Sequence, residues 1–268
     1  MERPERLVLL GHPVAHSLSP ALQAAALRRA GFLMAYEAMD VEAAQLATVA
    51  GLLREARGAG NVTVPHKEAF AALCRRRSPV ADRVGAVNTF WTEDGELIGD
   101  NTDVGGFDAA VRRHFGNRHE RGTIAVLGAG GSSAAVIAAA ERWGGARVHI
   151  TARTRARADA LAARFARIAT VHEHAADAVR DASLVVNATP VGLHGSDLPL
   201  DPALLSVGTD VFDLTYRRGE TPWVHACRAR GLRAADGLAM LVEQGALAFE
   251  RWFGVSPDRE AMWQAVRE

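Results

Sequence analysis

The residue with the clearest capacity for proton chemistry in this sequence is Lys67. Lysine and arginine together number 31, yet Lys67 is the only lysine. A genome that favours arginine over lysine explains the 30 arginines. The single lysine has then either survived by chance or been retained for a function. Arginine stays protonated in proteins, whereas a lysine ammonium can release its proton. We therefore interpret Lys67 as a candidate general acid or base.

The stretch GNVTVPHK at residues 60–67 predicts where this lysine lies. Residues 61–64 have the pattern of a strand, and Pro65 is typical of the start of a helix. Lys67 would then lie in the first helical turn, where the helix dipole disfavours an ammonium. The carboxyl ends of strands in open α/β sheets are also where ligands bind. This position favours a functional role over that of a solvated surface lysine.

Three further polar residues are candidates, each with a structural alternative. Asp103, in the stretch GDNTDVGGF, either caps a helix that begins near Val104 or faces the same cleft as Lys67. Ser19 is placed to cap a helix over residues 21–30, with Pro20 at its first position. Ser17 has no comparable structural explanation, and its hydroxyl is a candidate for ligand binding.

A second kind of chemistry is indicated by TIAVLGAGGSSAAVIAAA at residues 123–140. A buried strand, a glycine turn and a helix N-terminus in this order form a phosphate-binding corner. The third glycine of G-x-G-x-x-G is replaced by Ser133, so an ordinary strand-to-helix turn is the alternative. The residues expected at the phosphates are Gly128, Ala129, Gly130, Gly131 and Ser132.

The next predicted strand, residues 147–150, is followed by TARTRAR without an acidic residue. An acid at this place binds the ribose 2′-hydroxyl of NAD, whereas arginines suit the 2′-phosphate of NADP. The alternative is a solvated basic helix start, which is disfavoured because the N-terminus of a helix is electropositive. Arg153, Arg155 and Arg157 therefore predict NADP as the cofactor.

The composition limits the kinds of fold and of partner that are compatible with these residues. The 268 residues are 49% hydrophobic, enough for two α/β domains, and the zero net charge argues against a general binder of nucleic acid or of anionic membranes. The two cysteines suggest neither a metal site nor a disulfide framework, which favours a reducing compartment. The apolar run at residues 7–10 is too short for a signal peptide, and no stretch is long enough to span a membrane. We expect a cytoplasmic protein that binds no metal.

Alternating strands and helices predict an α/β fold class, with a mostly parallel sheet in the N-terminal half. Beyond the elements already given, the pattern predicts strands at residues 6–10, 32–39, 86–89 and 207–214, and a helix over residues 43–57. A hairpin is predicted around Asp94-Gly95. Residues 112–122 are polar and poorly periodic, and are expected to connect two domains.

Four motifs occur in an order that resembles the shikimate dehydrogenases and their quinate-using relatives. They are G-x-P-x-x-H-S-x-S-P at 11–20, N-V-T-x-P-x-K at 61–67, A-V-N-T at 86–89 and N-T-D-x-x-G at 101–106. The resemblance runs the length of the chain. It implies a substrate-binding domain at residues 1–104, an NADP-binding Rossmann domain at 105–236, and C-terminal helices at 237–268 that pack back on the substrate domain.

The resemblance also implies roles for matched residues. Ser17 and Ser19 would hold a substrate carboxylate. Lys67 would transfer the proton with Asp103 beside it. The residues implied to bind substrate hydroxyls or reach the substrate are Thr63, Asn88, Asp103, Tyr216 and Gln244, and an ordinary core tyrosine is the alternative for Tyr216. The implied cofactor residues, beyond the glycine turn, are Ala152 (where the family has asparagine), Arg153, Thr154, Arg155, Ala156, Arg157, Thr189, Leu214 and Gly237.

The activity that the resemblance implies is an NADP-dependent, reversible reduction of 3-dehydroshikimate to shikimate, a step of aromatic amino acid biosynthesis. Two alternatives stay open, namely a quinate/shikimate dehydrogenase that uses NAD and a non-catalytic nucleotide-binding sensor of the same fold. A small-molecule substrate is expected as the partner, without nucleic acid or membrane. The expected state is a monomer or homodimer.

Overall fold

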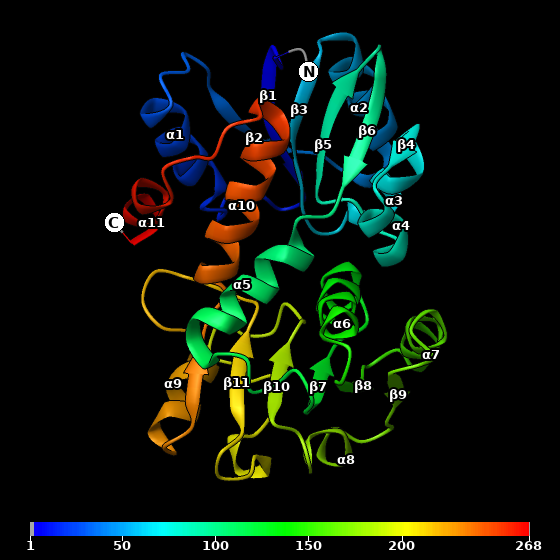
Figure 1. Cartoon of the computed structure of the whole chain (residues 1–268), viewed down its shortest axis with the longest axis vertical. Helices are drawn as coiled ribbons and strands as arrows, with labels where there is room; N and C mark the ends of the chain where they lie inside the picture. Colours follow the sequence, from blue (N-terminus) through cyan, green and yellow to red (C-terminus); the bar gives the residue numbers. More distant parts are fainter. Residues whose placement is uncertain (1–2, 268) are drawn as a thin grey trace. The chain divides into compact units, whose positions relative to one another are not determined.

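The computed structural model describes residues 3–267 and divides into two compact units (Figure 1). Unit 1 contains the described residues up to Gly106 and those from Leu241 onward. Unit 2 is Phe107–Met240. Both boundaries fall inside helices, α5 (Asp103–Phe115) and α10 (Leu238–Phe253). No helix of the described residues is long and apolar enough to cross a membrane.

Unit 1 is built on a six-stranded sheet in the order β2-β1-β3-β5-β6-β4. Its strands are β1 (Arg6–Gly11), β2 (Tyr36–Asp40), β3 (Gly58–Val62), β4 (Arg76–Arg77), β5 (Thr89–Glu93) and β6 (Glu96–Asp100). The pairs β1–β2, β1–β3 and β4–β6 are parallel, while β5 is antiparallel to both β3 and β6. The mostly parallel sheet expected from the sequence is therefore present, with an antiparallel hairpin inserted into it.

The predicted hairpin at Asp94-Gly95 is confirmed. These two residues join β5 to β6 and have φ angles of 52° and 73°. Two consecutive residues with positive φ give the turn that matches the twist of a two-residue hairpin, and aspartate and glycine adopt it readily.

The helices of unit 1 cover this sheet and close its core. They are α1 (Ser19–Arg29), the 3₁₀ helix η1 (Ala43–Gln45), α2 (Leu46–Glu55), α3 (Lys67–Leu73), α4 (Pro79–Val84), α11 (Arg259–Arg267) and the part of α10 from Leu241 onward. The C-terminal helix α11 packs against α1. The apolar residues of β1 are almost completely buried because helices lie on both sides of a central parallel strand.

Several predicted boundaries in unit 1 are wrong. The strand expected at 32–39 forms only from Tyr36, because the Phe32 ring stacks on Phe253 at a centroid distance of 4.3 Å instead of joining the sheet. The strand expected at 86–89 begins only at Thr89, and the Val87 amide donates to the Lys67 carbonyl. The strand expected at 61–64 is β3, which ends at Val62. The helix expected at 43–57 is divided into η1 and α2.

Unit 2 is built on a six-stranded, fully parallel sheet in the order β12-β11-β10-β7-β8-β9. Its strands are β7 (Thr123–Leu127), β8 (Arg147–Thr151), β9 (Ala169–Val171), β10 (Leu184–Asn187), β11 (Asp210–Asp213) and β12 (Arg233–Ala235). The chain passes between them through α6 (Gly131–Trp143), α7 (Arg155–Arg164), α8 (Ala175–Val179), the 3₁₀ helix η2 (Pro202–Leu204) and α9 (Pro222–Ala229).

This order is that of a Rossmann sheet, as the sequence predicts. Strand order reverses between β7 and β10, which lie side by side in Figure 1. Doubly wound sheets bind nucleotides at the carboxyl ends of the strands that flank such a reversal. The strand expected at 207–214 forms as β11, shortened to four residues.

Candidate active site

Lys67 and Asp103 form a buried ion pair in unit 1. Lys67 Nζ lies 2.6 Å from Asp103 Oδ2, and the two side chains are 13% and 6% exposed. Lys67 is the first residue of α3 and Asp103 the first of α5. Pro65 lies two residues before α3 and does not begin it, which corrects the predicted helix start. A largely buried lysine held by a carboxylate can exchange a proton with an alcohol or carbonyl oxygen in the same site.

Asn88 connects this pair to Thr102 and to Gln244 of α10. Its Nδ2 donates to Asp103 Oδ1 at 2.8 Å, to Thr102 Oγ1 at 3.0 Å and to Gln244 Oε1 at 3.2 Å. Its Oδ1 accepts from the Thr102 backbone amide at 2.7 Å. A backbone N–H can only donate, so this bond fixes which way the Asn88 amide faces. Lys67, Asn88, Asp103 and Gln244 therefore form one hydrogen-bonded cluster.

Ser17 and Thr63 lie in the loops that follow β1 and β3, and Ser19 begins α1 at the end of the first of these loops. These strands are parallel neighbours, and Thr63 N, directly after β3, donates to the carbonyl of Leu10 in β1 at 2.8 Å. Ser17 and Thr63 are half-buried, whereas Ser19 is buried. The carboxyl edge of the sheet thus carries both the serine loop and the segment with Lys67.

The capping role expected for Ser19 is wrong. Helix α1 begins at Ser19, and the residue that precedes it, Leu18, makes no side-chain cap. The acceptor is Ser17, whose Oγ receives a hydrogen bond from Ser19 N at 3.2 Å. The amide of Ser19 has no intrahelical acceptor because it is at the N-terminus of α1, and Ser17 satisfies it from two residues upstream.

Two residues of this site went unassigned at the sequence level. Thr102 holds Asn88 through its amide and hydroxyl, although only the neighbouring aspartate of the N-T-D motif was given a role. Asn61 is buried, donates from Nδ2 to the Asn88 carbonyl at 3.1 Å and accepts from the Tyr36 hydroxyl at 2.8 Å. Its position could have indicated a role for Asn61, because Asn61 precedes Thr63 by two residues and alternate residues of an extended segment lie on the same face.

In unit 2, the glycine turn joins β7 to α6 at the point where strand order reverses. Gly128 has φ of 119°, and a Cβ there would lie 2.9 Å from the Ala188 carbonyl oxygen, so only glycine fits. A Cβ at Gly130 would meet nothing within 4 Å. The first amides of α6, at Gly131 and Ser132, begin the helix beside this open space. Because the first amides of a helix lack intrahelical acceptors, the turn can bind a pyrophosphate.

Ser133, in the place of the third glycine, is fully buried. Its Oγ accepts from the Gly130 amide at 3.3 Å. The hydroxyl therefore ties the turn to the first turn of α6, and the side chain is accommodated without opening the corner.

The arginine-rich segment lies at the start of α7. Arg153, Thr154, Arg155, Ala156 and Arg157 are exposed, and Ala152 is half-buried. Thr154 is the N-cap without a side-chain cap bond. Arg155 Nε pairs with Asp159 Oδ1 at 2.8 Å, one turn along the helix. Part of the positive charge is thus compensated within α7, while the segment as a whole remains basic and accessible to an anion.

The ends of β10 and β11 are joined by a polar network. Asp213 is buried, and its carboxylate accepts hydrogen bonds from Asn187 Nδ2, Thr215 Oγ1 and Thr221 Oγ1, each at 2.8 Å. Burial raises the pKa of Asp213, against the opposite effect of these hydrogen bonds. Asn187 Oδ1 in turn accepts from the amide and hydroxyl of Thr189. The segments that follow β10 and β11 therefore act as one structural unit.

Leu214 and Gly237, both expected at the cofactor, are in contact. A Cβ at Gly237 would lie 2.3 Å from the Leu214 carbonyl oxygen, and Gly237 N donates to the Thr215 carbonyl at 3.0 Å. Tyr216 follows in the same loop of unit 2 and is half-buried.

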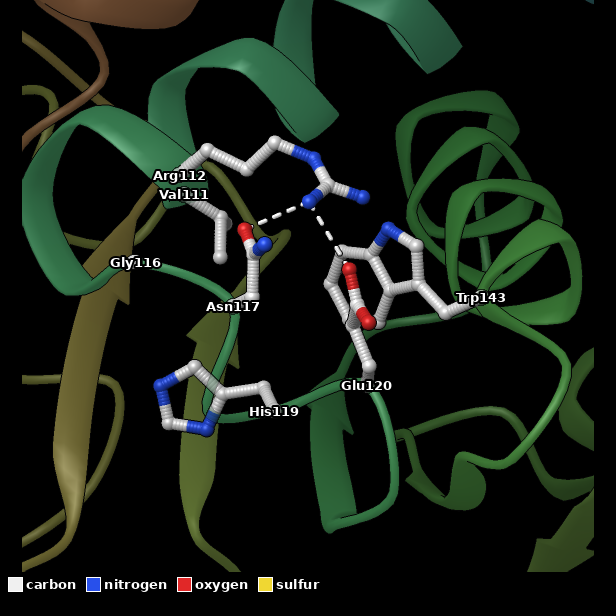
Figure 2. A pocket seen from close by; sticks show the side chains of 7 residues that line it. All are labelled: Val111, Arg112, Gly116, Asn117, His119, Glu120 and Trp143. Carbon is white, nitrogen blue, oxygen red and sulfur yellow. Dashed lines mark hydrogen bonds and ion pairs between the residues drawn. The ribbon is translucent and has the colours of Figure 1, made fainter.

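Unit 2 also contains a small hollow, which none of the predicted site residues lines (Figure 2). It has an empty volume of about 140 Å³ and is lined by Val111, Arg112, Gly116, Asn117, His119, Glu120 and Trp143. Ligand sites measure about 300–1,000 Å³. The polar groups at the hollow also satisfy one another, since Arg112 bonds to Asn117 and lies 2.8 Å from Glu120 (Figure 2). This hollow is therefore not a candidate active site.

Comparisons with known proteins agree with this geometry. Residues 9–90 match the family model described as shikimate dehydrogenase substrate binding domain, and residues 237–267 match the shikimate 5'-dehydrogenase C-terminal domain. A protein of Mesorhizobium japonicum named shikimate dehydrogenase (NADP(+)) is 43% identical over 99% of this chain and 96% of its own length. A protein of the same name from Thermus thermophilus is 45% identical, covering 98% and 97%.

The structural comparison gives the same answer. A crystal structure of shikimate 5-dehydrogenase from Thermus thermophilus in complex with NADP(H) and shikimate superposes with a TM-score of 0.88. It is 42% identical in sequence, and the match covers 98% of each chain.

Proposed function

This chain belongs to the shikimate dehydrogenase family, and from that premise we propose that it catalyses the NADP-dependent, reversible reduction of 3-dehydroshikimate to shikimate. The observation that carries the proposal is the buried pair of Lys67 and Asp103 at the carboxyl edge of the unit 1 sheet. Hydride transfer to a ketone leaves a negative oxygen, and a proton must reach that oxygen. Lys67 is the group that can supply it.

The residues of unit 1 have separate parts in this chemistry. NADPH, when bound, supplies the hydride. Lys67 donates a proton from Nζ to the substrate oxygen during reduction and accepts it during oxidation. Asp103 holds the ammonium by its Oδ2, and the hydrogen bond from Asn88 keeps its other oxygen in place. The pair is thus oriented before the substrate arrives, which lowers the entropic cost of the reaction.

Substrate binding is assigned to the polar groups around that pair. The hydroxyls of Ser17 and Ser19 bind the carboxylate, because they follow β1 at the same sheet edge as Lys67. Thr63, Asn88 and Gln244 bind ring hydroxyls, with support from the hydrogen-bonded cluster in which Asn88 and Gln244 already lie. Tyr216 of unit 2 is the remaining substrate residue in this proposal.

The cofactor is assigned to unit 2, whose residues fit it. The open space at Gly130 and the amides that begin α6 suit the pyrophosphate. The basic start of α7 suits the 2′-phosphate, with Arg153 and Arg157 as its principal ligands. The remaining contacts are assigned to Ala129, Ala152, Thr154, Ala156, Thr189, Leu214 and Gly237.

Unit 1 is accordingly the substrate domain and unit 2 the cofactor domain in this proposal. We assign the enzyme to the cytoplasm, as a monomer or homodimer. The support for a reducing compartment is that Cys74 and Cys227 are both buried free thiols, and burial raises the pKa of each to about 12. Such thiols are protonated and poorly reactive.

The test is an initial-rate assay of the purified protein that crosses shikimate and quinate with NADP and NAD. Shikimate with NADP should give the highest kcat/KM of the four combinations. A preference for quinate with NAD would replace the proposed activity by that of a quinate dehydrogenase. Binding of NADP without turnover of either substrate would indicate a sensor.

A further inference from the structure

Asp100 holds together three elements around the segment that carries Asp103. It is the last residue of β6, and its side chain is only 4% exposed. Oδ1 accepts from the Ser78 hydroxyl and, at 2.7 Å, from the Asn101 amide. Oδ2 accepts from Arg251 Nε at 2.8 Å. Ser78 is also the N-cap of α4.

Among the described contacts of the Asp100 carboxylate, Arg251 is the one positively charged partner. It extends from α10, and its side chain is 58% exposed, so the guanidinium reaches a buried anion from the surface. A buried carboxylate without a partner costs several kcal/mol, whereas a paired and hydrogen-bonded one is tolerated. Arg251 therefore supplies the charge compensation that the buried Asp100 carboxylate needs in its present position.

The position of Asp100 is transmitted to the cluster around Lys67 by short backbone links. The Asp100 carbonyl accepts from Asn88 N at 3.1 Å. Two residues along, Thr102 N donates to Asn88 Oδ1, and the next residue is Asp103. Movement at Asp100 would thus shift both Asp103 and the amide that holds it.

Helix α10 contacts both Asp100 and Asn88. Gln244 and Arg251 are seven residues apart on α10, which places them on one face of the helix two turns apart. Gln244 Oε1 accepts from Asn88, and Arg251 bonds to Asp100. The helix is thus held at Asn88, which bonds to Asp103, and at Asp100, the residue that begins the segment Asp100–Asp103.

We propose that Arg251 is a positioning residue for the reaction, which acts by neutralising Asp100 and so fixing the segment from which Asp103 holds Lys67. The role assigned to Arg251 rests on the proposed function. In this role Arg251 contacts neither the substrate nor the reacting atoms. Its replacement should therefore lower turnover and leave cofactor binding unchanged.

The experiment compares four variants of the full-length protein in the shikimate–NADP assay. Arg251→Met removes the charge and keeps the length of the side chain, and Arg251→Lys keeps a charge without the guanidinium. Arg251→Met with Asp100→Asn also removes the anion left behind. Arg259→Met is the matched control, because Arg259 pairs with Glu243 and Glu250 of the same helix and has no recorded contact with Asp100.

We expect Arg251→Met to lower kcat about 10- to 100-fold, the range that small displacements of catalytic groups produce. The KM for NADP should stay within twofold of the wild-type value. Arg251→Lys should lose less, and the double variant should recover most of the loss because asparagine still accepts the two remaining hydrogen bonds without a charge. Arg259→Met should leave kcat unchanged, and thermal unfolding of each variant checks that it is folded.

Wild-type turnover in Arg251→Met, an equal loss in Arg259→Met, or no recovery in the double variant would each overturn this role. A wild-type protein that does not oxidise shikimate with NADP would overturn the proposed function itself, and the role of Arg251 with it. Normal wild-type activity with unaffected variants would overturn only the role of Arg251.

Discussion

Replacement of Lys67 tests the proposed chemistry most directly, and its stability cost can be separated from its catalytic cost. Nζ lies 2.6 Å from Asp103 Oδ2, and both side chains are largely buried. Removal of one partner of a buried ion pair costs about 3–5 kcal/mol, because the other charge remains without compensation. The hydrogen bond from Asn88 to Asp103 offsets part of that cost. Lys67→Met should therefore be destabilised as well as inactive.

The catalytic cost follows from proton transfer. Loss of a general acid–base group lowers turnover by about 10²- to 10⁴-fold. A double variant, Lys67→Met with Asp103→Asn, removes the uncompensated charge and should regain most of the lost stability while staying inactive. NADP binding should survive in both variants, because the proposed phosphate ligands lie in unit 2.

Lys67→Arg separates proton transfer from charge. Guanidinium keeps the positive charge beside Asp103 but does not release its proton near neutral pH, so this variant should be nearly as inactive as Lys67→Met. The assay is the initial rate of NADPH formation from shikimate, with thermal unfolding and NADP titration on the same samples. Near wild-type turnover in Lys67→Arg would refute the role of Lys67 in proton transfer and leave it only an electrostatic one.

Three further predictions concern other sites. Arg153→Ala should raise the KM for NADP and leave that for NAD nearly unchanged, and an equal loss with both cofactors would contradict a 2′-phosphate site. Ser17→Ala should raise the KM for shikimate and, through the lost bond to the Ser19 amide, lower stability by about 1 kcal/mol, whereas unchanged values would exclude both roles. Burial lowers the pKa of His119, so the unfolded chain binds its proton first and stability should fall below about pH 6.5, by at most about 1.4 kcal/mol per pH unit. In unfolding experiments from pH 7.5 to 5.5, His119→Asn should reduce this slope, and an unchanged slope would assign it to other groups.

The sequence predicted the parts of the site that depend on local order. Lys67, Asp103 and the glycine turn each follow a strand or begin a helix, and such positions are recognisable from apolar runs followed by proline, glycine or small polar residues. The fold class and the Rossmann arrangement follow from the same alternation, and the comparisons with solved structures confirm them.

The contacts between distant segments could not be obtained in this way. The Asn88–Gln244 hydrogen bond joins residues 156 positions apart, and the Asp100–Arg251 pair joins residues 151 apart. No local periodicity specifies either contact. Ser17 and Ser19 show the same limit at short range. Residue type and the position of the proline predict Ser19 as the cap of the helix, whereas the loop geometry makes Ser17 Oγ the acceptor of the Ser19 amide.

The geometry of Asn88 explains why the A-V-N-T and N-T-D motifs occur together. The Oδ1 atom of Asn88 accepts a hydrogen bond from the Thr102 amide, and its Nδ2 atom donates to Asp103 and Gln244. Its own amide donates to the Asp100 carbonyl, so the two motifs are cross-linked by backbone and side chain alike. Loss of either motif would leave polar groups of the other buried without partners, a cost of about 1–3 kcal/mol per group. The site therefore depends on both motifs for its stability as well as for the orientation of Lys67.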